Sequence, residues 1–241
     1  MDTDREWEKW GSLEPYFGVI TNPEFRLQNL DEAAKERFFA SGRAHVEHVI
    51  RVCRERIDRS FHPRRALDFG CGVGRITLAL ASVSETVVGL DVSESMLREA
   101  EDNRIKHGIP NVSFLVSDDC LSTVKGTFDF IHSFIVFQHL EVARARAIFA
   151  KLLERLASGG IFVAHFTYAK AQHPDSFGRA PPAEHPREEI QQDAQGDPVM
   201  LMNSYDVNEL LFVMQTSGVM SFFTEFTDHG GELGVLLYFQ R

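Results

Sequence analysis

The sequence predicts an α/β protein built on a mainly parallel, seven-stranded sheet that ends in an antiparallel hairpin. Two observations lead to this prediction. Between residues 65 and 166, short apolar runs alternate with amphipathic helical patterns, which is typical of β-α-β units. Near the end of the chain, apolar runs at 218–226 and 234–240 flank the turn-forming residues 227–233, and this arrangement indicates two paired antiparallel strands.

The alternating region is expected to hold five strands and three helices, with helices on both faces of the sheet. The helix after the second strand opens at Ser93, and the pair Gly159-Gly160 ends the third helix. A further helix begins at the capping sequence Asp206–Glu209. The strands are predicted at 65–69, 86–91, 112–116, 128–134 and 161–166, and the helices at about 73–82, 93–107 and 141–157.

Two regions fall outside this alternation. Residues 1–30 contain many aromatic and turn-forming residues without a clear period, so we expect an irregular arm there. Helical patterns follow from Asp31, with a break at Ser41-Gly42. Residues 168–203 are rich in proline and polar residues, and so long a segment without a periodic pattern predicts either a disordered excursion or a lid-like insertion.

Charge and composition narrow the classes of partner. The formal net charge of -10 gives no basic surface for a phosphate backbone, which argues against nucleic-acid binding. The charged N-terminal sequence and the lack of a long apolar run predict a cytoplasmic protein that does not enter a membrane. Cys53, Cys71 and Cys120 are widely separated, so neither disulfides nor a cysteine-based metal site is expected.

A glycine-rich loop follows the first predicted strand, in the sequence "ALDFGCGVG". Glycine in ordered structure costs about 0.5–1 kcal/mol relative to alanine, so three glycines indicate that backbone must approach something closely. No lysine follows them, which argues against the P-loop of nucleoside triphosphatases. Arg75 stands where the dinucleotide-binding pattern G-x-G-x-x-G has its third glycine, so a dinucleotide is disfavoured but left open.

Acidic residues accompany the first three strands and suggest the class of ligand. Asp91 ends the second strand, where a carboxylate can accept hydrogen bonds from both hydroxyls of a ribose. Asp118 follows the third strand and can accept a hydrogen bond from the exocyclic amine of adenine. Asp68 and Asp118 also add negative charge that would repel a pyrophosphate. We therefore expect an adenosine-containing ligand without phosphates, and a cationic one best fits the acids.

At this point the chain resembles the class I S-adenosylmethionine-dependent methyltransferases of the small-molecule type. The resemblance covers about residues 40–167 and 204–241, with four motifs in the family's order. These motifs read "LDFGCGVGRIT", "VVGLDVSESMLREA", "NVSFLVSDD" and "FDFIHSFIVFQHL". The resemblance implies a Rossmann-like fold, S-adenosylmethionine as cofactor and S-adenosylhomocysteine as product. We expect a methyltransferase domain at 61–241, and an arm and helices at 1–60 that cover the cofactor because they flank the carboxyl edge of the sheet.

The family implies a role for each matching residue. Asp68 would lie near the ammonium group of the cofactor, Asp91 would bind its ribose, and Arg43 would pair with its carboxylate. The remaining cofactor residues are Gly70, Cys71 and Gly72 along the methionine portion, Val92 and Met96 beside the adenine, Asp118, Asp119 and Cys120 at its edge, and Phe134 under the sulfonium.

The acceptor is expected to be a small or medium-sized molecule methylated at O, N or C. His139 follows the fourth strand and is the candidate general base, with a packing role as the alternative. Tyr16, Phe17 and Tyr168 are candidate acceptor contacts. The D/N-P-P-Y/F motif of some nucleic-acid methyltransferases is absent, since "SFIV" occupies its place, and no metal is expected.

Two other functions stay open at the sequence level. The first is a nicotinamide-dinucleotide oxidoreductase, because the glycine loop is close to the dinucleotide pattern. The second is a non-catalytic cofactor-binding subunit that keeps the fold without transferring a methyl group. Neither the identity of the acceptor nor the oligomeric state follows from these residues.

Overall fold

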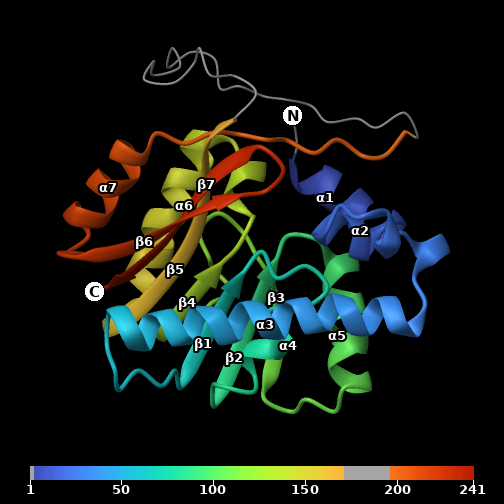
Figure 1. The fold of residues 1–241 in the computed structure, drawn as a ribbon, viewed down its shortest axis with the longest axis horizontal. Helices are drawn as coiled ribbons and strands as arrows, with labels where there is room; N and C mark the ends of the chain where they lie inside the picture. Colours follow the sequence, from blue (N-terminus) through green and yellow to red (C-terminus); the bar gives the residue numbers. More distant parts are fainter. Residues whose placement is uncertain (1–2, 171–195) are drawn as a thin grey trace. The chain divides into compact units, whose positions relative to one another are not determined.

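The computed structural model describes residues 3–170 and 196–241, and its seven strands form one sheet (Figure 1). The strand order is β3-β2-β1-β4-β5-β7-β6, with antiparallel pairing of β7 to both β5 and β6. The predicted fold class is therefore confirmed. The strands are β1 (Arg65–Phe69), β2 (Thr86–Asp91), β3 (Val112–Val116), β4 (Phe128–Ser133), β5 (Leu156–Lys170), β6 (Phe222–Asp228) and β7 (Glu232–Gln240).

The chain divides into two compact units that are described one after the other. The first unit comprises Met1–Asp118 with Ser122–Lys125, and the second comprises Asp119–Leu121 with Gly126–Arg241. Helices α1 (Thr3–Leu13), α2 (Pro15–Val19), α3 (Glu32–Arg56), α4 (Thr77–Leu80) and α5 (Glu94–Lys106) belong to the first unit, and α6 (Val142–Arg155) and α7 (Val207–Thr216) to the second. None of the helices in the described residues is long and apolar enough to cross a membrane.

Strands β1, β2 and β3 of the first unit are parallel and end together. The last pairs in their registers are Phe69 with Leu90 and Asp91 with Val116. The residues after these strands therefore gather at one edge, which is the ligand-binding edge of parallel α/β sheets. The glycine loop takes up residues 70–76, so α4 begins later than the predicted helix at 73–82 and is only one turn long.

Residues 3–30 form helices, so the predicted irregular arm is wrong. Helix α1 begins with acidic residues in its first turn and buries Trp10, and Pro15 occupies the first position of α2, where its missing N–H costs nothing. Both helices lie beside α5 (Figure 1). The sequence did not reveal them because each has few apolar positions and helices this short show a weak period.

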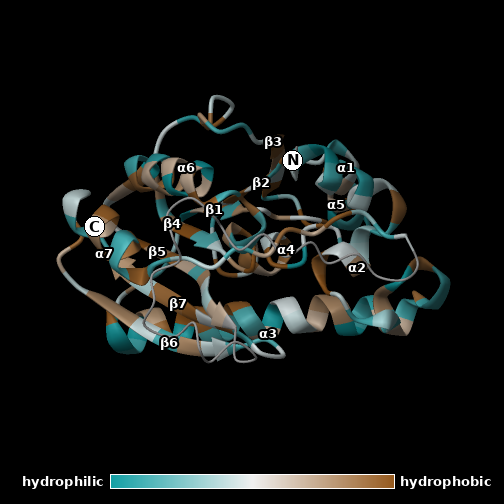
Figure 2. Cartoon of the chain, turned by 90° about the horizontal axis from the view of Figure 1, so that it is seen from above, coloured by the Kyte–Doolittle hydropathy of each residue, from teal (hydrophilic) through white to brown (hydrophobic). Residues whose placement is uncertain are grey.

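Helix α3 is continuous from Glu32 to Arg56, so the break predicted at Ser41-Gly42 is also wrong. The carboxylate of Asp31 accepts the N–H of Ala34 and caps its start. Hydrophobic and hydrophilic residues alternate along the helix (Figure 2). Gly42 serves packing rather than a turn, because a Cβ atom there would collide with the backbone carbonyl of Arg75.

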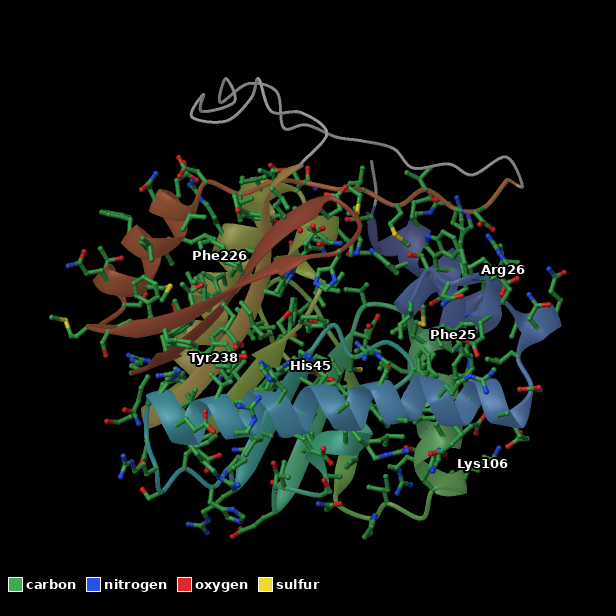
Figure 3. All side chains as sticks on the ribbon, viewed as in Figure 1. Phe25, Arg26, His45, Lys106, Phe226 and Tyr238 are labelled. Atoms are coloured by element: carbon green, nitrogen blue, oxygen red, sulfur yellow. The ribbon has the colours of Figure 1, made fainter. Side chains whose placement is uncertain are left out.

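The second unit packs an aromatic core against one face of its strands. Phe149 on α6 contacts the rings of Phe137, Phe162, Phe166 and Phe239 at centroid distances of 5.2–6.1 Å. Strand β5 is longer than the predicted 161–166, because β7 pairs with it as far as its last residue. Figure 3 labels two side chains of the neighbouring hairpin strands, Phe226 on β6 and Tyr238 on β7.

The packing of α3 leads to a test of stability. We expect Gly42→Ala to lower the free energy of unfolding by about 1–3 kcal/mol, because the added methyl group overpacks the contact with Arg75. Helix propensity alone would favour the alanine by about 1 kcal/mol. Urea unfolding followed by circular dichroism measures the difference, with the exposed Ala44→Gly as the reference for propensity. A more stable Gly42→Ala variant would contradict the close contact.

Candidate functional site

The glycine loop of the first unit is held against the end of β2. The backbone N–H groups of Gly70 and Cys71 both donate to the carbonyl of Leu90, at 2.8 and 2.9 Å. Gly70, Gly72 and Gly74 have φ values of 73°, 51° and 87°, a region that residues with a Cβ atom rarely adopt. The loop therefore needs glycine for its conformation, and it presents backbone rather than side chains at the sheet edge.

Asp91 joins this loop to the start of α5. Its carboxylate accepts the N–H of Gly72 at 2.8 Å and the N–H of Ser93 at 2.9 Å. Burial raises the pKa of Asp91 to about 6, and the two backbone donors oppose that rise. The residue predicted to bind the ribose is thus a half-buried carboxylate fixed at the carboxyl end of β2, next to the backbone of Gly72.

Asp68 and Arg75 place opposite charges beneath the loop. Asp68 is buried and accepts a hydrogen bond from Thr77 Oγ1 at 2.6 Å. Arg75 is also buried, with Nη1 donating to Ser41 Oγ at 3.2 Å and with Nε lacking a hydrogen-bond partner. Burial lowers the pKa of Arg75 to about 10, and the charge of Asp68 opposes that shift, so the guanidinium stays cationic.

Sequence reasoning treated Arg75 only as a departure from the dinucleotide pattern. The sequence does contain a signal for Arg75 as a site residue, because a cationic side chain directly follows the glycine loop. Arg43, in contrast, is the residue predicted to pair with the cofactor carboxylate, yet it is exposed and pairs with Glu36 on the same helix. Of these two cations, Arg75 is the one buried beside the loop, so the structure does not support the assignment of Arg43.

Helices α1 and α2 lie against the loop and against Met96. Met96 is buried, and a Cβ atom at Gly11 would lie 2.9 Å from its backbone nitrogen. A Cβ atom at Gly18 would lie 3.3 Å from Met96 Cε, and one at Gly72 would lie 2.6 Å from Val19 Cγ2. These three glycines allow the N-terminal helices to approach the residues predicted to border the methionine and adenine portions of the cofactor.

Glu8 fastens α1 to the start of α5. Its carboxylate accepts hydrogen bonds from Ser93 Oγ at 2.7 Å and from the N–H of Ser95 at 3.1 Å, and Ser95 Oγ donates as well. Burial raises the pKa of Glu8, but the hydrogen bonds from Ser95 and Ser93 outweigh it and leave a net decrease. The carboxylate also lies at the positive end of the α5 dipole. Sequence patterns gave no signal for this contact, because 85 residues separate Glu8 from Ser93.

The residues predicted at the adenine edge are exposed and fall on both sides of the unit boundary. Asp118, in the first unit, accepts hydrogen bonds from the backbone and hydroxyl of Ser122. Asp119, in the second unit, pairs with Arg144 through two bonds of 2.7 and 2.9 Å. Cys120 is exposed, and Val92 is half-buried after β2. Cys71 is buried and its thiol pKa is raised by burial, which makes it inert.

The two predicted acceptor contacts of the first unit take part in packing. Tyr16 is buried, and its hydroxyl lies 2.6 Å from Glu99 Oε1 and 2.9 Å from Asn103 Oδ1. Its hydroxyl is occupied within the protein, which corrects the prediction that Tyr16 contacts an acceptor. Phe17 is half-buried, with the guanidinium of Arg26 lying 3.7 Å from the centre of its ring.

In the second unit, His139 lies within a buried network. Nδ1 of His139 is 2.7 Å from the carbonyl of Leu201, and since a carbonyl only accepts, Nδ1 carries the proton. Nε2 of His139 then accepts a hydrogen bond from the amide nitrogen of Gln138 at 3.3 Å. The amide oxygen of Gln138 in turn accepts a hydrogen bond from Thr167 Oγ1 at 2.6 Å. Burial lowers the pKa of His139 to about 4, opposed by the bond to Leu201. The neutral ring is enclosed, which favours the packing alternative over the general base.

Phe134 and Tyr168 are placed in different surroundings of the second unit. The Phe134 ring lies 5.3 Å from His165 and 5.7 Å from His229, centroid to centroid. Tyr168 lines an apolar cavity of about 290 Å³ together with residues of β6, β7 and α7. Within residues 3–170 and 196–241, no three His, Cys, Asp or Glu side chains gather as metal ligands. The predicted lid at 168–203 lies outside the described residues between 171 and 195.

Loss of the Glu8 carboxylate should loosen the N-terminal helices. We expect Glu8→Gln to speed amide hydrogen exchange in α1 a few-fold at pH 7, because the charge at the α5 terminus and its hydrogen bonds are weakened. Since the pKa of Glu8 lies below 4.5, protection of α1 in the wild type should persist above that pH and fall as the carboxylate protonates. Glu94→Gln removes an exposed carboxylate from the same turn of α5 and is the control. Equal exchange in both variants would contradict the contact.

The network around His139 predicts a stability effect with a defined pH dependence. We expect His139→Asn to lower the free energy of unfolding by about 1–3 kcal/mol at pH 7. Because the folded state holds the pKa of His139 near 4, against 6.5 when unfolded, its contribution should fall as the pH drops from 6.5 toward 4. Urea titrations at several pH values test this, with the exposed His62→Asn as control. An unfolding free energy independent of the substitution would overturn the packing role.

Known proteins resemble the part of the chain that holds this site. Residues 66–160 match a family model described as a methyltransferase domain. An uncharacterized methyltransferase of Synechocystis sp. is 32% identical over 101 residues, which cover 41% of this chain and 45% of that protein. The chain thus spans less than half the length of this relative. The 23S rRNA methyltransferase RlmD of Marinomonas posidonica is 38% identical over 52 residues, only 22% of this chain and 12% of that protein.

A solved structure extends the likeness of the fold to the whole chain. Magnesium protoporphyrin IX methyltransferase from Synechocystis, crystallised with S-adenosylmethionine, aligns with a TM-score of 0.65 at 16% identity. The alignment covers 100% of this chain and 98% of that one. The glycine loop and Asp91 fall within the matched domain. Residues 66–160 of the chain therefore match a methyltransferase domain, and the chain shares its fold with a methyltransferase of known structure.

Proposed function

We propose that the protein transfers the methyl group of S-adenosylmethionine to a small-molecule acceptor. The observation that supports this most directly is the pairing of the glycine loop with the half-buried carboxylate of Asp91 at one sheet edge. A carboxylate in this place suits a ribose with two neighbouring hydroxyl groups. The match of residues 66–160 to a methyltransferase domain supports the same assignment.

The residues of the first unit fit this cofactor. The buried guanidinium of Arg75, with Nε unpartnered, would offer a donor and a positive charge to the carboxylate of the methionine portion. The buried carboxylate of Asp68 would favour the ammonium group, and Met96 would border the adenine. When bound, the cofactor supplies an electrophilic methyl group on a sulfonium. The protein's part is to bind and align the two reactants and to exclude water.

A small acceptor is favoured over a nucleic acid. The net charge of -10 opposes the approach of a phosphate backbone, and an RNA-modifying relative matches only 22% of this chain. The structural neighbour that aligns over the whole chain is named for a porphyrin acceptor. Because α1 and α2 lie close to the glycine loop and Met96, we infer that they cover the cofactor and limit the size of what reaches it.

Asp91 provides the test of the cofactor assignment. We expect Asp91→Asn to weaken S-adenosylhomocysteine binding by about 10- to 100-fold at pH 7.5, since a charged hydrogen-bond acceptor of the ribose is lost. In the wild type, affinity should rise as the pH passes upward through about 6, because only the ionised carboxylate accepts both ribose hydroxyls. The affinity of Asp91→Asn should show no such rise.

Isothermal titration calorimetry between pH 5 and 8 measures both effects. Asp102→Asn removes an exposed carboxylate from α5 and is the matched control for charge. Wild-type affinity that is undetectable, or unchanged in Asp91→Asn, would refute the cofactor site. Stronger binding of a nicotinamide dinucleotide than of S-adenosylhomocysteine would instead support an oxidoreductase.

A further inference from the structure

Three rings of the second unit gather at the carboxyl end of β4 and β5. Phe134 follows β4 directly, and the register of Ser133 with Ala164 places His165 level with it on the neighbouring strand. His229 lies in the hairpin between β6 and β7, and the antiparallel pairing of Lys170 with Glu232 brings that hairpin to the same end of β5. The rings of His165 and His229 lie 5.3 Å apart, centroid to centroid.

Gly234 creates the space that His165 occupies. Thr227 on β6 and Thr167 on β5 both stand opposite Gly234 on the intervening strand β7. Nε2 of His165 reaches across Gly234 to Thr227 Oγ1 at 2.8 Å. A Cβ atom at Gly234 would lie 2.5 Å from Nε2 of His165 and 2.6 Å from that hydroxyl oxygen. The imidazole is therefore fixed by a hydrogen bond that only glycine at this position allows.

The other nitrogen of His165 has no partner. His165 is 1% exposed, and Nδ1 is among the buried polar atoms without a hydrogen bond. Such atoms are rare in folded proteins, and a bound ligand is one of the usual ways to satisfy them. The hydroxyl of Thr227 can donate to Nε2, which leaves the proton of the neutral ring on Nδ1, where it can be donated to a ligand oxygen.

His229 is the accessible member of the pair. Its backbone N–H donates to the carbonyl of Glu232, and the carboxylate of Asp228 accepts the N–H of Gly231, so the turn that carries it is ordered. Burial lowers the pKa of His229, and the charge of Asp228 opposes this shift. The pKa of His165 is lowered to about 3, first by burial and then by the nearby His229 and His139. Both rings are neutral at pH 7, and His229 is the stronger base of the two.

We propose that Phe134, His165 and His229 bind an aromatic acceptor that carries a hydroxyl group, and that His229 accepts the hydroxyl proton. This inference rests on the proposed methyl transfer. The N–H at Nδ1 of His165 donates a hydrogen bond to the hydroxyl oxygen of the acceptor, and the rings of Phe134 and His229 contact the aromatic ring of the acceptor edge to face. The acceptor oxygen bonds to the methyl carbon as the carbon–sulfur bond breaks, its proton passes to an imidazole nitrogen of His229, and the electron pair stays on sulfur.

The basicity of the imidazoles selects this class of acceptor. A neutral imidazole removes a proton more readily from a comparatively acidic group, such as a phenol, than from an aliphatic alcohol. An amine acceptor, if neutral, would be nucleophilic without such a base. Asp228 is the charged residue that acts on His229, and no cation acts on either ring in the described part of the chain, so an anionic acceptor has no counter-charge there.

Binding is tested first, without turnover. With protein labelled with ¹⁵N at histidine and saturated with S-adenosylhomocysteine, catechol should shift the imidazole resonances of His165 and His229, assigned from His165→Gln and His229→Gln. The resonances of the exposed His62 should not move. If S-adenosylhomocysteine itself fails to bind the wild type, the proposed function fails. If it binds and neither catechol nor 4-nitrophenol moves the two histidines, the present inference is wrong.

Turnover then separates proton transfer from positioning. His229→Gln should lower kcat for catechol methylation by roughly 10²–10⁴-fold with S-adenosylhomocysteine affinity intact. Thr227→Val should raise KM for catechol on the order of 5-fold with less effect on kcat, because His165 loses the bond that orients it. Thr224→Val, on the opposite face of β6, is the matched control. Unchanged kcat in His229→Gln, or benzyl alcohol methylated as fast as catechol, overturns the proposal.

Discussion

The site of the first unit depends on one constraint, the need for the backbone after β1 to turn back onto the end of β2. The carbonyl of Leu90 takes the N–H groups of Gly70 and Cys71, and the carboxylate of Asp91 takes that of Gly72. The turn requires positive φ angles, so glycine is needed, and glycine leaves the backbone bare. Because three successive donors are held in this way, the loop is ordered before any ligand arrives, and binding need not supply the entropy of ordering it.

The lack of side chains at the glycines of the loop also determines how the N-terminal helices pack. A loop with side chains would hold α2 away, whereas Gly72 allows Val19 to approach, and Gly18 allows α2 to approach Met96. Glu8 then satisfies donors at the start of α5 that would otherwise face solvent. Helices α1 and α2 and the glycine loop are therefore parts of one packing arrangement within the first unit. A ligand that enters between them must displace contacts such as that of Val19, so the affinity of the site and the stability of α1 and α2 are linked.

The sequence predicted what local patterns determine. Strands β1, β2 and β3 match their predicted ranges, because apolar runs bounded by turns mark buried strands, and Asp91 was identified from its place at a strand end. The failures share a different cause. Gly42 was interpreted as a helix break because its contact with Arg75, 33 residues later, cannot be seen locally. For His139 the local sequence leaves both a base and a packing role open, because its burial depends on Leu201, far along the chain. Tertiary contacts of this kind override local propensity.

This contrast explains why the donor is easier to identify than the acceptor. The proposed cofactor site of the first unit depends largely on backbone geometry, which a short stretch containing Gly70, Gly72 and Gly74 encodes almost completely. The polar side chains of the second unit are held by partners 62 residues away, as His165 is held by the hydroxyl of Thr227 and His139 by the backbone carbonyl of Leu201. A substitution at either partner changes the surface offered to an acceptor while the glycine loop stays as it is. Acceptor specificity can thus change with few substitutions. The glycine loop, which indicates the class of reaction, therefore carries little information about which molecule is modified.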